Sequence, residues 1–97
     1  MLNTQQKETK ISPVVVRSYH HLGGTIRRIR KLKGISQGQL AKKAGLTQAT
    51  ISNLERAKSS AEIETLILIF AALSLDMVIA PRPKSKSDNQ KSLEGLF

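Results

Sequence analysis

Apolar residues recur at helical spacing between residues 19 and 73, whereas the stretches on either side largely lack that period. A first helix is expected over residues 19–33, with Ser18 as its N-cap. The inward face of this helix is expected to carry four apolar residues spaced three or four apart, namely Leu22, Ile26, Ile29 and Leu32. Because Gly23 and Gly24 each disfavour a helix by about 1 kcal/mol relative to alanine, the alternative is a start at Thr25.

The next stretch predicts two short helices joined by a tight turn. Ser36 and Gln39 have the spacing of a capping box, which starts a helix by satisfying free backbone N–H groups. Gly45 can adopt the left-handed conformation that ends a helix. Thr47 is a favourable N-cap for the following helix, which Glu55 closes. Two capping patterns on either side of one glycine predict a helix-turn-helix unit.

The last helix, expected from Ser60 or Glu62 to Leu73, is apolar almost all round. Such a helix has no face suited to water, so we expect part of it in the core and the surplus at a subunit interface. Residues 75–80 then predict a β-strand that ends at Pro81. Because a lone strand has no partner within the chain, we expect pairing with the same strand of a second copy. The residues expected in this dimer strand are Leu75, Met77, Val78 and Ile79.

Together these elements predict an all-α bundle of four to five helices, with one C-terminal β-strand pairing across a homodimer. The ordered domain is expected over residues 18–81. Residues 1–17 have the composition of a flexible N-terminal arm, and residues 82–97 that of a flexible C-terminal tail. At 97 residues the chain fits one domain with tails. A domain of this size has a modest core, which dimerisation would supplement.

The charge of the chain narrows the class of partner. The formal net charge is +9, and in residues 10–58 Glu55 is the only acidic residue among many lysines and arginines. A concentrated positive field favours a nucleic-acid partner. The alternative is a solvated surface that keeps a small protein in solution.

The outward face of the second short helix is polar, small and uncharged, as a helix in a DNA major groove requires. Glutamine and asparagine can bind adenine through two hydrogen bonds, serine can bind several bases, and an alanine methyl can contact thymine. The residues expected to read base edges are Gln48, Ala49, Ser52 and, less surely, Asn53. Those expected to bind phosphates are Gln37, Lys42, Lys43, Thr47 and Thr50. The alternative is a face that is merely solvated.

Glu55 lies at the C-terminal end of its helix, where the helix dipole disfavours an anion. A compensating cation is therefore expected, and Arg30 on the first helix can supply one through two parallel hydrogen bonds. We interpret Arg30 and Glu55 as a structural ion pair that orients the two helices. The alternative places Arg30 on a DNA phosphate.

No residues predict an enzyme, a metal site or a cofactor. The chain has no cysteine, no Ser/His/Asp grouping and no glycine-rich phosphate loop. His20 and His21 are adjacent, so on a helix they point about 100° apart and cannot bind one ion together. The beginning of the chain lacks the apolar stretch of a signal peptide, and its longest apolar run is shorter than the roughly 20 residues of a membrane span. We therefore expect a cytoplasmic, nucleoid-associated protein without membrane contact.

Residues 37–55 resemble the Cro/C1, or phage repressor-like, helix-turn-helix family, and the resemblance extends over about residues 20–74. Within it the HipB-type antitoxins are the most similar. That similarity rests on the runs Leu40-Ala41-Lys42-Lys43, Gln48-Ala49-Thr50-Ile51-Ser52-Asn53 and Leu73-Ser74-Leu75-Asp76-Met77.

The resemblance implies an autorepressor that binds a palindromic operator as a homodimer and neutralises a HipA-like serine/threonine kinase toxin. It implies that Gln37 and Gln48 lie on the operator. It also implies a tail that docks into the toxin through its last apolar residues, Leu93, Leu96 and Phe97. The alternatives are an ordinary flexible terminus, a phage-type repressor without a toxin partner, and a protein-interaction module without sequence-specific DNA binding.

Overall fold

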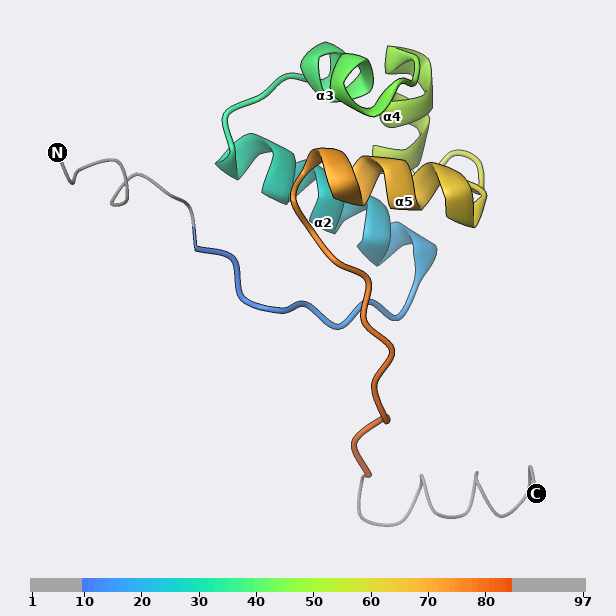
Figure 1. The fold of residues 1–97 in the computed structure, drawn as a ribbon. Helices are drawn as coiled ribbons and strands as arrows, with labels where there is room; N and C mark the ends of the chain where they lie inside the picture. The colour runs from blue at the N-terminus through green and yellow to red at the C-terminus, as the bar shows by residue number, and fades with distance from the viewer. Residues whose placement is uncertain (1–9, 85–97) are drawn as a thin grey trace, which may run out of the picture.

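Four helices are found among residues 10–84, the part of the chain that the computed structural model describes. They are α2 (Tyr19–Leu32), α3 (Gln37–Ala44), α4 (Gln48–Glu55) and α5 (Ile63–Ala72). α4 packs against α2 and α3, and α3 packs against α5. Figure 1 shows α3 and α4 together at one side of the bundle, while the extended segments before α2 and after α5 leave at the other. The all-α helix-turn-helix prediction is confirmed.

The start of α2 and the end of α3 lie at residues that the sequence indicates. The Ser18 hydroxyl accepts a hydrogen bond of 3.0 Å from the His21 backbone N–H, so α2 begins at Tyr19. The alternative start at Thr25 is therefore wrong. Gly45 ends α3 in the left-handed region, with φ of 75°, a conformation that costs glycine little because it has no Cβ.

Gly23 is buried at the contact between α2 and α4. A Cβ at this position would lie 2.2 Å from the carbonyl oxygen of Leu54, which is closer than two such atoms can approach. The absence of a side chain therefore allows α2 to cross directly over the end of α4. Helix propensity alone marks this glycine only as a weak point of the helix and gives no sign of its packing role.

The core lies where the four helices meet. Its fully buried side chains are Ile26, Leu40, Ile51, Leu54, Ile69 and Leu73. Leu22 is half-buried against them, as expected, but Leu32 is 49% exposed, so its predicted inward position is wrong. Leu32 lies six residues after Ile26, and at 3.6 residues per turn this places it about 120° around the helix from the buried face.

The outer face of α5 and the segment that follows it expose apolar side chains. On α5 these are Ile63, Ile67 and Leu68, and after it Met77, Val78 and Ile79. Residues 75–84 form no strand within this single chain. The predicted strand requires pairing with a second copy, which a single chain does not test, so it stays a prediction.

The expected boundaries of the arm, domain and tail also stay predictions. The toxin-docking residues Leu93, Leu96 and Phe97 lie outside the described residues. Among the helices of residues 10–84, none combines the length and apolar character needed to cross a bilayer.

Candidate nucleic-acid interface

α4 is held at a defined angle by the caps at its beginning and by the turn before it. The Ser36 hydroxyl and the Gln39 side chain form the predicted capping box of α3, with hydrogen bonds of 3.0 and 2.8 Å. At the start of α4 the Thr47 hydroxyl accepts a hydrogen bond of 3.2 Å from the Thr50 backbone N–H. These local bonds leave little freedom in the orientation of α4 relative to α3.

The four residues predicted to read bases differ in their exposure. Gln48 and Ala49 are exposed in the first turn of α4, whereas Ser52 and Asn53 are half-buried. Asn53 lines a hollow of about 250 Å³ between α4 and the loop before α5. The first turn of α4 is therefore the part of the helix that projects furthest from the bundle.

The predicted phosphate-binding residues lie around this turn but are not all free. Lys42 and Lys43 are exposed in the last turn of α3. The Thr47 and Thr50 hydroxyls lie 2.9 Å apart and share a hydrogen bond. The two lysines can therefore provide mobile positive charge, while the threonines serve first to cap α4.

Arg30 and Glu55 form a buried ion pair. Arg30 Nε donates to Glu55 Oε2 at 2.6 Å, and Arg30 Nη2 donates to Glu55 Oε1 at 2.9 Å. Arg30 Nη1 donates to the Ile35 carbonyl oxygen at 2.9 Å. The two residues are 6% and 7% exposed. The guanidinium therefore joins α2, α4 and the loop before α3, and it is not at the surface for a phosphate.

The surroundings keep both groups of the pair charged. Burial by itself raises the pKa of the Glu55 carboxyl, but hydrogen bonds from Arg30 and Gln37 lower it. The positive charges of Arg30 and Arg27 lower it further, so the pKa of Glu55 lies below its ordinary value. The hydrogen bond with Glu55 raises the pKa of Arg30, although desolvation opposes that shift.

Gln37 connects the buried pair to the exposed turn of α4. Its Nε2 donates to Glu55 Oε1 at 3.0 Å, and its Oε1 accepts a long hydrogen bond of 3.4 Å from Gln48 Nε2. Gln37 and Gln48 are the first residues of α3 and α4, so the two helix N-termini meet at this contact. Both residues are candidate DNA contacts from sequence alone, but no local signal predicts a contact between these positions, which are eleven residues apart.

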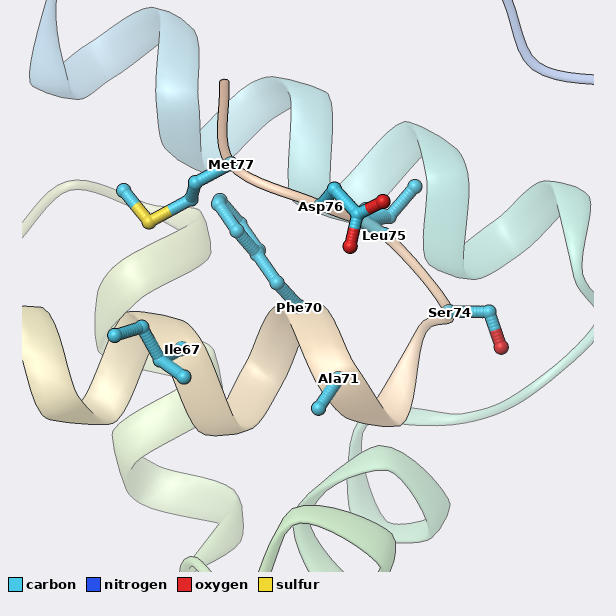
Figure 2. Close-up of a pocket in the computed structure, with 7 residues that line it drawn as sticks. All are labelled: Ile67, Phe70, Ala71, Ser74, Leu75, Asp76 and Met77. Atoms are coloured by element: carbon cyan, nitrogen blue, oxygen red, sulfur yellow. The ribbon is translucent and has the colours of Figure 1, made fainter. Parts of the chain in front are cut away.

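A second exposed surface lies at the C-terminal end of α5. Residues of α5 and of the segment after it line an open groove of about 460 Å³. Figure 2 shows Phe70 extending from α5 toward Met77, with Leu75 and Asp76 on the segment above the helix. Among the predicted dimer-strand residues, Leu75 packs against the core, whereas Met77, Val78 and Ile79 are 48%, 79% and 101% exposed.

His20 and His21 are both exposed at the start of α2. Within residues 10–84 there is no group of three or more histidine, cysteine or acidic side chains placed to hold a metal ion.

Comparison with known proteins agrees with this architecture. The family described as Helix-turn-helix matches residues 26–79. Antitoxin HipB of Escherichia coli strain K12 is 35% identical over 75 residues, which cover 75% of this chain and 85% of that protein. Antitoxin HipB of Escherichia coli O6:H1 is 33% identical over 75 residues, covering 75% and 80%.

Solved structures of HipB are also similar to this fold. A HipB-O4 20mer complex has a TM-score of 0.67 and 31% identity, covering 72% of this chain and 99% of that one. The HipB chain of a HipA-HipB-O2-O3 complex gives the same TM-score, identity and coverage.

Proposed function

The chain belongs to the helix-turn-helix family, together with the HipB antitoxins, and on that premise we propose that it is a sequence-specific DNA-binding autorepressor and the antitoxin of a type II toxin–antitoxin module. The observation that supports DNA binding most directly is the exposed, uncharged first turn of α4 in a strongly basic domain. The protein is not itself an enzyme, and it neutralises its toxin by forming a complex with it.

The proposed operator interface centres on Gln48 and Ala49. Glutamine can donate to adenine N7 and accept from N6, and an alanine methyl can contact the thymine methyl. Ser52 and Asn53 lie further along the same helix and are half-buried. They are the proposed secondary contacts to base edges. Lys42, Lys43, Gln37, Thr47 and Thr50 would position the helix on phosphates, and the adjoining N-termini of α3 and α4 add a favourable dipole there.

The proposed assembly is a homodimer on a palindromic operator. Its interface would combine the exposed face of α5 with residues 75–80, of which Met77, Val78 and Ile79 expose their side chains to water in the single chain. A two-fold axis would place the two copies of α4 in successive major grooves about 34 Å apart. The protein would act on the chromosome, in the cytoplasm.

The proposed toxin partner is a HipA-like serine/threonine kinase. The similarity to HipB, one structure of which is a HipA-HipB-O2-O3 complex, supports this assignment. The last apolar residues, Leu93, Leu96 and Phe97, are the proposed docking segment of the tail.

Two measurements test these proposals separately. Selection from a random duplex pool should enrich a palindrome with half-sites about one helical turn apart, and no enrichment would indicate an interaction module. Mixing the protein with a HipA-like kinase should produce a stable complex and suppress kinase activity. Enrichment of a palindrome without any effect on the kinase would leave a repressor that has no toxin partner.

A further inference from the structure

The segment before α2 is anchored to the bundle at both of its ends. Ile11 is partly buried against the hydrophobic core. At the other end the Ser18 carbonyl and hydroxyl oxygens accept hydrogen bonds of 2.9 and 3.0 Å from the first turn of α2. Residues 12–17 between these anchors belong to no helix. With the segment after α5, they lie on the side of the bundle away from α3 and α4 (Figure 1).

The side chains of this segment follow the two-residue repeat of a strand. Val14 and Val16 are 36% and 40% exposed, whereas Val15 between them is 64% exposed, so one face is partly covered and the other is in water. Valine favours strands, and Pro13 stands at the beginning, where a strand tolerates proline. Within the described part of the chain, residues 14–16 make no backbone–backbone hydrogen bond. The segment therefore has the pattern of a strand and an edge that is free to pair.

The segment after α5 also has backbone groups free to pair. No backbone–backbone hydrogen bond joins residues 76–80 to the rest of residues 10–84, and Met77, Val78 and Ile79 are exposed. The proposed dimer pairs residues 75–80 across the two-fold axis. A two-stranded ladder is marginally stable by itself and leaves its two outer edges open. Each outer edge can therefore accept a further strand.

Charge selects one antiparallel register between the two segments. Asp76 is the only charged residue of residues 75–80, and Arg17 is the only one of residues 13–17. Placing these two exposed side chains opposite each other makes the next three opposed pairs apolar. The pairs in this register are Arg17–Asp76, Val16–Met77, Val15–Val78 and Val14–Ile79. Opposite charges and β-branched side chains stabilise a ladder when they lie directly across it, and a slip of one residue would separate them.

We propose that residues 14–17 of one copy pair with residues 76–79 of the second copy, so that the two N-terminal segments form the outer strands of a four-stranded sheet between the subunits. This inference rests on the proposed homodimer. The pairing is between copies, since within one chain the two segments stay unpaired. Because residues 12–17 are already anchored at both ends, ordering them on binding costs little entropy. The contact lies outside residues 26–79, which the helix-turn-helix family matches.

Cross-linking tests the pairing directly, because the chain has no cysteine of its own. Opposed residues of an antiparallel ladder have Cα atoms about 4.5–5.5 Å apart, which is within the range of a disulfide. Val15→Cys protein mixed with Val78→Cys protein should therefore form a mixed disulfide in a glutathione redox buffer. Val15→Cys mixed with Ile79→Cys is the matched control and should give only background, because a shift of one residue places the side chains on opposite faces.

The double variant Val15→Cys/Val78→Cys separates pairing between copies from pairing within one chain. Peptide mapping of its covalent dimers by mass spectrometry should find residue 15 of one copy linked to residue 78 of the other. The same link inside a monomer would overturn the proposal. A mixture in which positions 15 and 78 link no better than positions 15 and 79 would also overturn it.

Charge reversal tests the register. Arg17→Glu should raise the dissociation constant of the dimer about 2- to 30-fold, because two pairs of opposite charges become pairs of like charges. Adding Asp76→Lys to Arg17→Glu should restore most of the loss. Lys10→Glu makes the same reversal outside the register and should leave the constant unchanged. Equal weakening by Arg17→Glu and Lys10→Glu would overturn the register, since net charge alone would then explain both.

Hydrogen exchange of the wild-type protein tests the inference without any substitution. Among the amides of residues 14–17, those directed at the partner strand should exchange more slowly at concentrations where the protein is dimeric. A dimer in which all of these amides stay unprotected would overturn the inference and leave the proposed homodimer intact. A protein that stays monomeric at every concentration would instead refute the proposed homodimer itself.

Discussion

At the scale of single residues, the most consequential side chain is Glu55. Its position at a helix end within a basic half of the chain indicates a cationic partner, and this reasoning from sequence named Arg30, which the structure places within 2.6 Å. The same reasoning could not reveal that Gln37 is a third member. A glutamine at the start of a helix has many available partners, and only the crossing of α2, α3 and α4 selects one.

The depressed pKa of Glu55 predicts an acid-dependent loss of stability. Because this carboxyl has a lower pKa folded than unfolded, its contribution is present above the unfolded value, about 4.3. The contribution is lost as the pH falls through the folded value. Chemical denaturation of the wild-type protein at decreasing pH should show this loss beginning below about pH 4.3.

Glu55→Gln supplies the comparison. At pH 7 we expect it to lower the free energy of unfolding by about 3–5 kcal/mol, because Arg30 stays buried without its counter-charge. The difference from wild type should narrow as the pH falls below about 4.3, because the carboxyl of the unfolded wild-type chain is then protonated and the folded carboxylate loses its advantage. A difference that stays constant over this range would show that the carboxylate charge is not what stabilises the fold.

At the scale of helices, the beginnings and ends were predictable because their signals are local. Ser36 with Gln39, Gly45 and Thr47 all act within four residues of the backbone groups that they satisfy. Gly23 shows where local reasoning stops. Gly23 is required because a carbonyl oxygen of α4, distant in sequence, lies where its Cβ would be. Helix propensity does not include that contact and predicts only a weak first turn.

Alanine substitutions at Gly23 and Gly24 should therefore have opposite effects. Gly23→Ala places a methyl group into the Leu54 carbonyl oxygen and should cost about 1–3 kcal/mol or more, the usual cost of overpacking. At Gly24 a Cβ would meet no atom within 4 Å. Gly24→Ala should therefore raise the free energy of unfolding by about 0.5–1 kcal/mol, because alanine favours the helix more than glycine does. Urea denaturation measures both changes. Equal destabilisation by the two substitutions would rule out the contact between α2 and α4 as the cause.

At the scale of the whole molecule, the described chain leaves apolar surface uncovered. The sequence predicted this surplus because α5 is apolar almost all round, and the structure exposes Ile63, Ile67 and Leu68. No local signal in the sequence identifies the surface that covers these side chains, since the predicted partner of residues 75–80 would lie in another molecule. The helix-turn-helix unit could therefore be predicted residue by residue, whereas the dimer strand stays a prediction.

An acidic substitution in the exposed segment tests the proposed dimer. Val78 is 79% exposed, so Val78→Asp should leave the fold of the single chain intact while placing a charge in the subunit interface. Sedimentation should then show a shift from dimer to monomer. Val15→Asp makes the same change at an exposed position of the arm, 64% exposed, and should remain dimeric. A Val78→Asp protein that remains dimeric would remove residues 75–80 from the interface.

The measurement that tests the central claim most directly is the affinity of Gln48→Ala for its selected palindrome and for random DNA at one salt concentration. If the first turn of α4 reads bases, the variant should lose about 1–3 kcal/mol on the palindrome and become indifferent to one base pair in each half-site, with little change on random DNA. Equal losses on both duplexes would show that Gln48 contributes no base recognition, and would contradict the account of α4 as the reading helix.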